Sequence, residues 1–189
     1  MNLETMNLET MNLETMNLET KNLETKRCYC RLPLEADTDL LQALYADTRT
    51  GQFSPNINHN GPEAIRTMLY QWRLHWDHHG FGPWLIEVKG DRPKPIGVGG
   101  VSMRNFDGQS LPNLWYRFFP DAWGSGFATE FTEACLTWMR RETQVDTVFA
   151  LVHPQNSASL RVLEKLGMQS DGELQLAEQT SLRYRLKLV

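Results

Sequence analysis

The stretch from residue 114 to residue 138 constrains the fold of this chain more than any other part of the sequence. Residues 114–119 form an apolar and aromatic run suited to a buried strand, and Pro120 ends it. Gly124 and Gly126 follow within a short turn. Apolar residues then recur with the 3.6-residue period of one helical face, at Phe127, Phe131, Ala134, Cys135 and Trp138. The pattern predicts a strand that passes through a glycine-rich turn directly into a helix.

The physical use of such a turn is anion binding. The first amides of a helix have no partner within the helix, and the helix dipole places partial positive charge there. Glycines let the backbone come close, so amides from about Gly124 to Ala128 could hold a phosphate without a Lys or Arg. A tight connection without a ligand explains the same residues, and the G-x-G spacing alone does not decide between the two.

The residues around the turn also resemble a known family. The chain contains neither G-x-x-x-x-G-K-[ST] nor G-x-G-x-x-G, the two commonest phosphate loops. Residues 123–128 resemble the [QR]-x-x-G-x-[GA] acetyl-CoA pyrophosphate loop of the GNAT N-acetyltransferases, with Trp123 where Gln or Arg is usual. The frame Y-R-L-x-P-x-x-W-G-x-G-[YF]-A-T-E is typical of the RimJ/RimL-like branch, and residues 116–130 match it with Phe118 in place of Leu.

A second stretch, residues 153–168, carries the same resemblance. It is similar to the branch signature H-P-x-N-x-x-S-x-x-V-L-E-K-L-G-[FM]. From the residues alone it reads as a helix that Asn156 or Ser157 caps and Gly167 ends, with a face of Leu160, Leu163 and Leu166. Together the two stretches are specific, and the resemblance extends over residues 31–189.

The remaining sequence predicts an α/β (α+β) fold. The expected elements, in order, are a short edge strand at 31–34, helices at 36–47 and 62–80, strands at 84–88, 96–103 and 113–119, a helix at 127–141, a strand at 147–152, a helix at 156–167, and strands at 172–176 and 182–189. A mixed sheet flanked by helices fits this order. The resemblance implies a GNAT-like mixed, mostly antiparallel seven-stranded sheet with a central splay.

Residues 1–25 are five copies of a pentapeptide, Met-Asn-Leu-Glu-Thr four times and Lys-Asn-Leu-Glu-Thr once. A five-residue step turns a helix by about 140°, so no apolar stripe forms, and an odd period puts successive Leu residues on opposite faces of a strand. A pentapeptide-repeat β-helix is the alternative, but five repeats would give little more than one coil. We therefore expect a low-complexity extension at 1–25 that does not pack on the domain, and a GNAT-like acetyltransferase domain at 26–189.

Composition limits the partners and the compartment. The 189 residues carry a formal net charge of -4, which gives no electrostatic footprint for DNA or RNA as a main partner. No window approaches the roughly 18 apolar residues of a membrane span, and the start lacks a secretory signal, so we expect a cytoplasmic protein without a membrane partner. Cys28, Cys30 and Cys135 are expected to be reduced and structural. The oligomeric state, monomer or homodimer, stays open.

The resemblance implies a cofactor and its ligands. Acetyl-CoA would be the co-substrate, without a metal, and its pantetheine would lie in the splay against backbone at about residues 117–119. Asn156 would hydrogen-bond the pantetheine arm, and Ser159 would lie near the sulfur. The residues expected to bind the cofactor are Arg117, Phe118, Phe119, Trp123, Gly124, Ser125, Gly126, Phe127, Ala128, Thr129, Asn156 and Ser159. His75, His78 and His79 could present two imidazoles to a metal, but a His-rich helix end also gains from the dipole alone.

The chain lacks two catalytic residues that other members of the family carry. Many family members carry a Glu before the loop where this chain has Asn113, which cannot accept a proton but could hold a water. The Tyr that other branches use as general acid is replaced by Leu163, so Ser159 is the remaining candidate to protonate the thiolate. His153, Asp107 and a water chain are the options for the base, and the loop at 48–61 is expected to face the acceptor.

These features lead to two hypotheses of function. The first is transfer of an acetyl group from acetyl-CoA to a primary amine, on a protein or peptide amino terminus or on a small molecule, by direct attack in a ternary complex. The second is a non-catalytic acyl-CoA-binding or regulatory domain of the same fold. An intact phosphate loop fits both hypotheses, and thiol release from acetyl-CoA with a panel of amines would separate them. A structural domain whose turn binds nothing is a third, blander interpretation.

Overall fold

The computed structural model describes residues 21–53, 61–106, 108–176 and 179–189. Its core is one sheet of eight strands in the order β1-β2-β3-β4-β5-β6-β8-β7. The strands are β1 (Leu23–Glu24), β2 (Cys28–Arg31), β3 (Pro83–Val88), β4 (Lys94–Phe106), β5 (Gln109–Phe118), β6 (Thr147–Val152), β7 (Gln169–Leu176) and β8 (Gln179–Lys187). Neighbouring strands are antiparallel except β5 and β6, which are parallel. The predicted mixed, mostly antiparallel sheet is confirmed, with one strand more than the seven expected.

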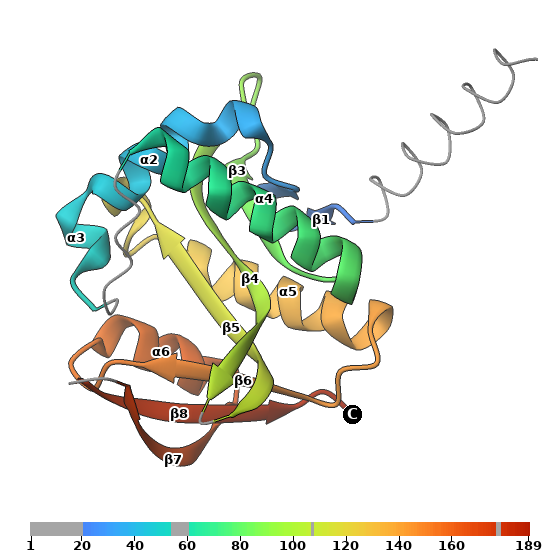
Figure 1. Ribbon diagram of the computed structural model, residues 1–189, viewed down its shortest axis with the longest axis vertical. Coiled ribbons are helices and arrows are strands. Elements are labelled where there is room, and N and C mark those ends of the chain that lie inside the picture. The colour runs from blue at the N-terminus through green and yellow to red at the C-terminus, as the bar shows by residue number, and fades with distance from the viewer. Residues whose placement is uncertain (1–20, 54–60, 107, 177–178) are drawn as a thin grey trace, which may run out of the picture.

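Helices cover both faces of the sheet (Figure 1). They are α2 (Thr38–Ala46), α3 (Thr48–Gly51), α4 (Pro62–His79), α5 (Phe127–Glu142) and α6 (Ser157–Lys165), with short 3-10 turns η1 (Glu35–Asp37) and η2 (Pro120–Ala122). On one face, α2 and most of α4 pack on β3 and β4 through a cluster that includes Leu41, Leu44, Ile65, Leu85 and Val98. On the other face, α5 packs through Phe131, Leu136 and Met139. The helices predicted at 36–47, 62–80, 127–141 and 156–167 are present.

The additional strand comes from the end of the pentapeptide repeat. Leu23 pairs with Cys30, and its side chain is 8% exposed, within the main core cluster. Lys21 also contributes, because its carbonyl oxygen accepts a hydrogen bond of 2.6 Å from the Trp84 indole. Of residues 21–25, which the sequence assigned to the extension, Leu23 and Glu24 are therefore part of the sheet, and Lys21 is bonded to it. Residues 1–20 lie outside the described residues.

The first predicted strand lies earlier than expected. It was placed at 31–34, but β2 is Cys28–Arg31. The side chains of Cys28 and Cys30 alternate inward, each 1% exposed, while Tyr29 points outward. Cysteine behaves here as a small apolar residue, so the alternation of the strand is Cys-Tyr-Cys. All three cysteines are free and buried, as expected.

The sheet opens between β5 and β6. The two strands pair at Asn113 with Phe149 and at Leu114 with Ala150, although β5 continues to Phe118. Farther along, the Phe119 amide donates to the Ile96 carbonyl on the other side, at 2.9 Å. Because backbone groups alternate along a strand, Tyr116 and Phe118 direct theirs toward the gap. The predicted central splay is thus present, and it leaves one edge of β5 open.

Candidate active site

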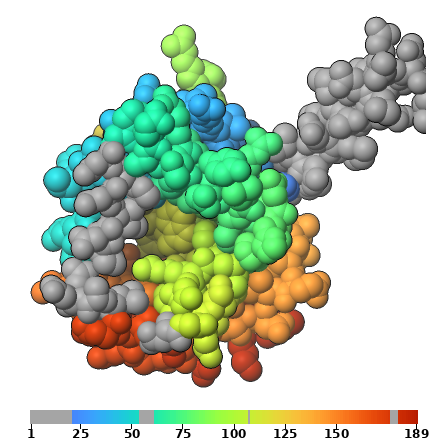
Figure 2. Space-filling model, viewed as in Figure 1, coloured from blue at the N-terminus to red at the C-terminus, as the bar shows by residue number. Residues whose placement is uncertain are grey.

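A cavity of about 1360 Å³ occupies this gap and extends to both sides of it. Its wall includes the glycine-rich turn, the last residues of β5 and β6, one side of α6, and residues of α4. Figure 2 shows the hollow beside α4, with β5 at its bottom. The cavity therefore connects the predicted phosphate loop with the open edge of β5 and with the opposite face of the sheet.

The glycine-rich turn has the backbone that anion binding requires. Gly124 and Gly126 adopt φ angles of 72° and 79°, in the left-handed region that favours glycine. Gly126 is the N-cap of α5, and its carbonyl accepts the first helical bond, from the Glu130 amide. The amides of residues 127–129 precede that bond, at the positive end of the helix dipole.

Trp123 has a role that its place in the motif does not reveal. Its indole nitrogen donates to the Phe118 carbonyl at 2.9 Å, at the end of the open edge of β5. Trp123 is 51% exposed, and both Trp123 and Phe118 line the cavity. The tryptophan thus ties the glycine-rich turn to the strand that precedes it.

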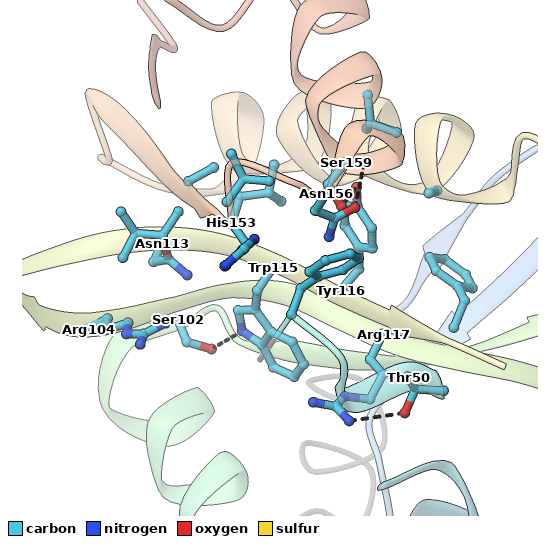
Figure 3. Close-up of a pocket in the computed structure, with 18 of the residues that line it drawn as sticks. Thr50, Ser102, Arg104, Asn113, Trp115, Tyr116, Arg117, His153, Asn156 and Ser159 are labelled. Atoms are coloured by element: carbon cyan, nitrogen blue, oxygen red, sulfur yellow. Dashed lines mark hydrogen bonds between the residues drawn. The ribbon is translucent and has the colours of Figure 1, made fainter. Parts of the chain in front are cut away.

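Two predicted residues, the N-cap residue of α6 and a residue of its first turn, lie together at the gap (Figure 3). Asn156 caps the helix, since its Oδ1 accepts a hydrogen bond of 3.1 Å from the Ser159 amide. This leaves the Nδ2 group of Asn156 as the donor that a ligand could meet. Ser159 lies one turn farther along, and both residues line the cavity.

Tyr116 is a residue that the sequence analysis did not assign to the site. Its hydroxyl donates to Ser159 Oγ at 3.1 Å, across the gap from β5 to α6. Burial raises the pKa of Tyr116, although the hydrogen bond to Ser159 acts in the opposite direction. The hydroxyl therefore keeps its proton at neutral pH and is available as a donor. The signal was present, because strand alternation puts Tyr116 on the face shared by Leu114 and Phe118.

Arg117, Trp115 and Asn113 point to the opposite side of β5. The Arg117 guanidinium donates to Thr50 Oγ1 at 3.1 Å and lies 4.3 Å from the centre of the Tyr45 ring. Burial lowers the pKa of Arg117 below its usual value. Of residues 117–119, expected to offer backbone to pantetheine, Phe118 is the one whose carbonyl faces the gap. The Arg117 side chain lies on the far side of the sheet, near the carboxyl end of α2.

Asn113, the residue in place of the family's Glu, is 4% exposed. Its Oδ1 accepts no hydrogen bond within the described part of the chain. Across the strand pair it faces Ser102, whose Oγ accepts from the Trp115 indole at 3.0 Å. An unsatisfied amide oxygen at the wall of a cavity is unusual, since most buried polar atoms have partners.

The two side chains that the sequence suggested as a base are His153 and Asp107. His153 stacks on Phe53 with ring centres 5.3 Å apart, and its Nδ1 accepts from the Gln155 amide at 3.2 Å. The neutral ring then carries its hydrogen on Nε2, so in this arrangement the imidazole offers a donor. Asp107, the other candidate, and residues 54–60 of the predicted acceptor loop lie outside the described residues. The first part of that loop is the short helix α3, not a coil.

The histidines of α4 have a structural partner. His75 Nδ1 lies 2.8 Å from the Phe81 carbonyl, and its Nε2 accepts from the Met103 amide at 2.9 Å. A carbonyl needs a donor, so the proton is on Nδ1 and the ring is neutral. Burial lowers the pKa of His75. Among the described residues, no group of three or more His, Cys, Asp or Glu side chains is arranged to hold a metal ion.

Comparison with known proteins identifies the class that this fold and cavity define. Residues 27–169 match the family described as "Acetyltransferase (GNAT) domain", which is more than half of the chain. The chain therefore belongs to the GNAT acetyltransferase family.

Individual relatives are more distant. The uncharacterized protein YkkB of Bacillus subtilis is 34% identical over 90 residues, which is 48% of this chain and 52% of YkkB. The uncharacterized N-acetyltransferase YnaD of the same organism is 27% identical over 75 residues, 40% of this chain and 44% of YnaD. The chain thus spans about half the length of the curated relatives it matches.

Solved structures show the same fold over most of the chain. A putative GNAT-family acetyltransferase from Bordetella pertussis covers 87% of this chain and 98% of its own, with a TM-score of 0.74 and 20% identity. Mycobacterium smegmatis RimJ, in complex with CoA-disulfide, covers 88% and 85% with a TM-score of 0.71 and 18% identity. A spermidine N-acetyltransferase from Vibrio cholerae, with CoA and spermine, covers 86% and 96% with a TM-score of 0.71 and 12% identity. In the described part of this chain, no helix has both the length and the apolar character needed to cross a membrane.

Proposed function

We propose that the protein transfers an acetyl group from acetyl-CoA to a primary amine, by direct attack of the amine in a ternary complex. The observation that carries this proposal is the cavity, which joins the glycine-rich turn to the open edge of β5 and continues to the α4 side of the sheet. A cofactor that enters past the turn and an amine that enters from the α4 side would meet in the gap. Family membership and the CoA complex of RimJ support the choice of cofactor.

The residues of the turn supply the binding energy in this proposal. The pyrophosphate would accept hydrogen bonds from amides between Gly124 and Thr129, at the start of α5. The pantetheine amides would pair with the backbone of Tyr116 and with the Phe118 amide, which the sheet leaves open, and with Nδ2 of Asn156; the Phe118 carbonyl already accepts from the Trp123 indole. The chain's own backbone thus provides most of the ligands, which explains why few cationic side chains are needed at the turn.

In the chemical step, the amine lone pair attacks the thioester carbonyl carbon, the attacking nitrogen gives up a proton to water, and collapse of the tetrahedral intermediate expels the thiolate. The thiolate takes a proton from Ser159, Ser159 recovers one from the Tyr116 hydroxyl that donates to it, and Tyr116 regains its proton from solvent. Holding amine and thioester together removes much of the entropic barrier. A water held near Asn113 would carry away the proton that the ammonium loses before the attack.

A panel assay tests this proposal. Purified protein is incubated with acetyl-CoA and small amines, polyamines or peptides with free amino termini, and released thiol is measured. Binding is measured in parallel as a thermal shift, because a ligand at 100 times its dissociation constant stabilises the native state by about 2.7 kcal/mol. Thiol release with at least one amine is expected. A thermal shift with no release from any amine would favour the non-catalytic acyl-CoA-binding domain, and no thermal shift would refute both.

A further inference from the structure

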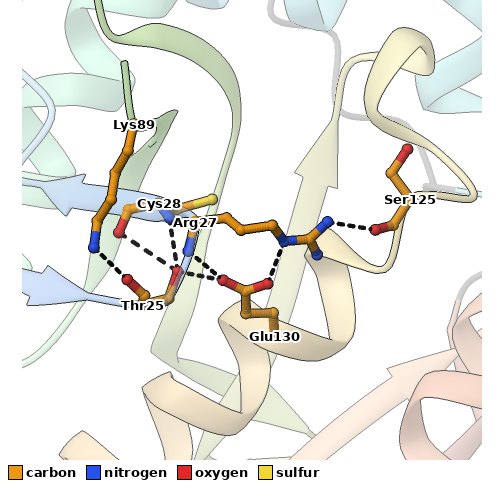
Figure 4. A network of polar contacts seen from close by, with 6 residues as sticks. All are labelled: Thr25, Arg27, Cys28, Lys89, Ser125 and Glu130. Carbon is orange, nitrogen blue, oxygen red and sulfur yellow. Dashed lines mark hydrogen bonds and ion pairs between the residues drawn. The ribbon is translucent and has the colours of Figure 1, made fainter. Parts of the chain in front are cut away.

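An ion pair outside the cavity holds the first turn of α5 (Figure 4). The Glu130 carboxylate accepts hydrogen bonds from Thr25 Oγ1 at 2.7 Å, from the Arg27 amide at 2.7 Å and from Arg27 Nε at 2.6 Å. Thr25 and Arg27 lie about 100 positions before Glu130 in the chain. The end of the repeat and the residue just before β2 thus hold the helix that begins at the glycine-rich turn.

The Arg27 guanidinium also contacts the turn itself. Its Nη1 donates to the Ser125 carbonyl at 2.9 Å, and its carbon lies 4.2 Å from the centre of the Phe127 ring. Its Nη2 lies 3.6 Å from the position that a Cβ on Gly126 would occupy. The guanidinium is therefore packed along the turn from residue 125 to residue 127.

The bond to Ser125 has a consequence for the neighbouring amide. In a trans peptide the carbonyl and the following N–H point in opposite directions. Because the Ser125 carbonyl points to Arg27, the Gly126 amide points away from Arg27, and Gly126 lines the cavity. Arg27 therefore fixes the orientation of a peptide whose N–H is one of the candidate phosphate ligands.

The ion pair also decides the charge at the anion site. Glu130 is in the first turn of α5, where a bare carboxylate would repel a bound phosphate. Burial acts to raise the pKa of Glu130, but the hydrogen bonds from Thr25 and Arg27 lower it below its usual value. Glu130 is thus ionised at neutral pH, and Arg27 neutralises it at 2.6 Å.

Lys89 contacts the segment that contains Thr25 and Arg27 on the side away from the glycine-rich turn. Lys89 on the loop after β3 donates to the Thr25 carbonyl at 2.6 Å and forms an ion pair with Glu24. Its ammonium also lies 4.9 Å from the centre of the Tyr29 ring. None of these Lys89 contacts involves the glycine-rich turn, so Lys89 holds the same segment without touching the candidate site.

We infer that the segment 25–27 is a working part of the cofactor site, with Arg27 as a positioning residue that orients the Ser125–Gly126 peptide and neutralises Glu130, so that the turn can bind the pyrophosphate of CoA. This inference rests on the proposed function. It predicts a defect confined to ligands that carry the pyrophosphate. Charge-assisted hydrogen bonds of this kind change affinity by about 10-fold or more when one partner is removed.

Calorimetric titration with CoA tests the inference on wild type and two variants. Arg27→Met keeps an aliphatic side chain but loses the guanidinium group, and its dissociation constant for CoA should rise about 10-fold. Lys89→Met is the matched control, because it removes one positive charge beside the segment 25–27. The backbone bond from the Lys89 amide to the Arg27 carbonyl and the pairing of β1 with β2 still hold the segment, so the CoA affinity should stay within about 2-fold. Where turnover is measurable, Arg27→Met should raise the KM for acetyl-CoA and leave both kcat and the rate with S-acetyl-pantetheine, which has no pyrophosphate, near wild type.

The outcomes separate two failures. If wild type binds CoA and Arg27→Met binds it equally well, this inference alone is overturned. If wild type does not bind CoA, the proposed function falls and the inference falls with it. Should Arg27→Met fail to fold, Arg27→Gln in a folded protein serves in its place, because it also removes the guanidinium charge beside Glu130 and the bond to the Ser125 carbonyl. Unchanged CoA affinity in that variant would likewise overturn the inference.

Discussion

Single side chains decide how a departing thiolate would receive its proton. The helix position at which other branches place a Tyr carries Leu163, which is buried with 3% exposure and has no proton to give. The family resemblance implied Ser159 as the remaining donor, and the structure adds Tyr116, whose hydroxyl donates to it. The sequence search looked for a tyrosine along the helix, whereas the partner comes from β5. Strand alternation shows which face of β5 Tyr116 occupies, but the helix motif alone does not reveal that its hydroxyl meets Ser159, 43 positions away.

Replacement of Ser159 by Ala should lower kcat by about 10-fold to 1,000-fold and change CoA affinity little, because a donor to the developing thiolate is lost. Tyr116→Phe should give a smaller loss of kcat, since Ser159 remains. Asn156→Ala should instead raise the KM for acetyl-CoA and cost about 1 kcal/mol of stability, because Asn156 also caps α6. Single-turnover rates with a good amine check the predicted losses of kcat, and steady-state kinetics and thermal denaturation check the KM and the stability of Asn156→Ala. Full turnover by Ser159→Ala would show that water or another group protonates the sulfur.

His75 should make stability depend on pH. Its folded-state pKa lies below the usual value near 6.5, so the unfolded chain binds a proton more readily. The stabilising contribution is therefore complete above about pH 6.5 and is lost as pH falls through the folded-state pKa. Protonation would force Nε2 to give up the Met103 amide. His79, whose ring centre lies 4.5 Å away, has a pKa lowered by burial in the same direction.

Chemical denaturation between pH 5 and 8 measures this effect. Wild type should lose stability below pH 6.5, and His75→Gln should lose less over the same range because the glutamine does not titrate. A pH profile of His75→Gln that superimposes on wild type would assign the effect to other groups.

The elements that sequence periodicity located best are those with a complete local signal. The strand expected at 113–119 and the helix expected at 127–141 correspond to the end of β5 and to α5. β4 and β5 extend beyond the predicted ends because they form a hairpin of ten paired positions, and pairing with a partner strand overrides weak local propensity. β1 could not be predicted, because the five repeats look alike and the pairing of the fifth with β2 depends on tertiary contacts that the repeat itself does not encode. The orphaned Asn113 oxygen likewise depends on packing that no local pattern encodes.

The turn before α5 should tolerate no side chain at residue 126. A valine at φ 79° costs about 1–3 kcal/mol of backbone strain, and its side chain would crowd the Arg27 guanidinium that packs along the turn. Gly126→Val should therefore lower the melting temperature and abolish the CoA-induced shift. Gly172→Val is a matched control, because Gly172 has a φ of 94° in β7 and does not line the cavity.

Both glycine variants should lose stability, but Gly172→Val should keep a wild-type CoA shift. The measurement is the melting temperature with and without saturating CoA. Retained CoA affinity in folded Gly126→Val would mean that the pyrophosphate binds elsewhere.

For the whole molecule, the structure changes the expected amino-terminal boundary of the domain but not the expected fold class. The mixed splayed sheet followed from the family resemblance, whereas the sequence assigned residues 21–25 to an extension without a packing role. The structure gives those residues a buried Leu23, the Trp84 bond to Lys21 and the bond from Thr25 to Glu130. Periodicity measures whether a segment has its own stripe, and it does not report that one leucine fills a place in the core.

Two truncations measure this boundary. Removal of residues 1–20 keeps every contact described above, and we expect melting temperature and CoA affinity to stay within error. Removal of residues 1–25 takes away Leu23 and Thr25 as well, so the melting temperature should fall by several degrees, since burial of a leucine alone is worth about 1.5–3 kcal/mol. CoA affinity should fall with it. Equal melting temperatures for the two truncations would show that residues 21–25 do not stabilise the domain.

The short pairing of β5 with β6 has a consequence for the protein between rounds of catalysis. Two residue pairs join a half-sheet of β1–β5 to a half-sheet of β6–β8. A ligand that hydrogen-bonds to both strands in the gap would supply the inter-strand contacts that β5 and β6 do not make with each other. Amide hydrogen exchange along β6 should therefore slow when the gap is filled. Proteolytic lifetime would then rise with the concentration of the ligand that fills the gap.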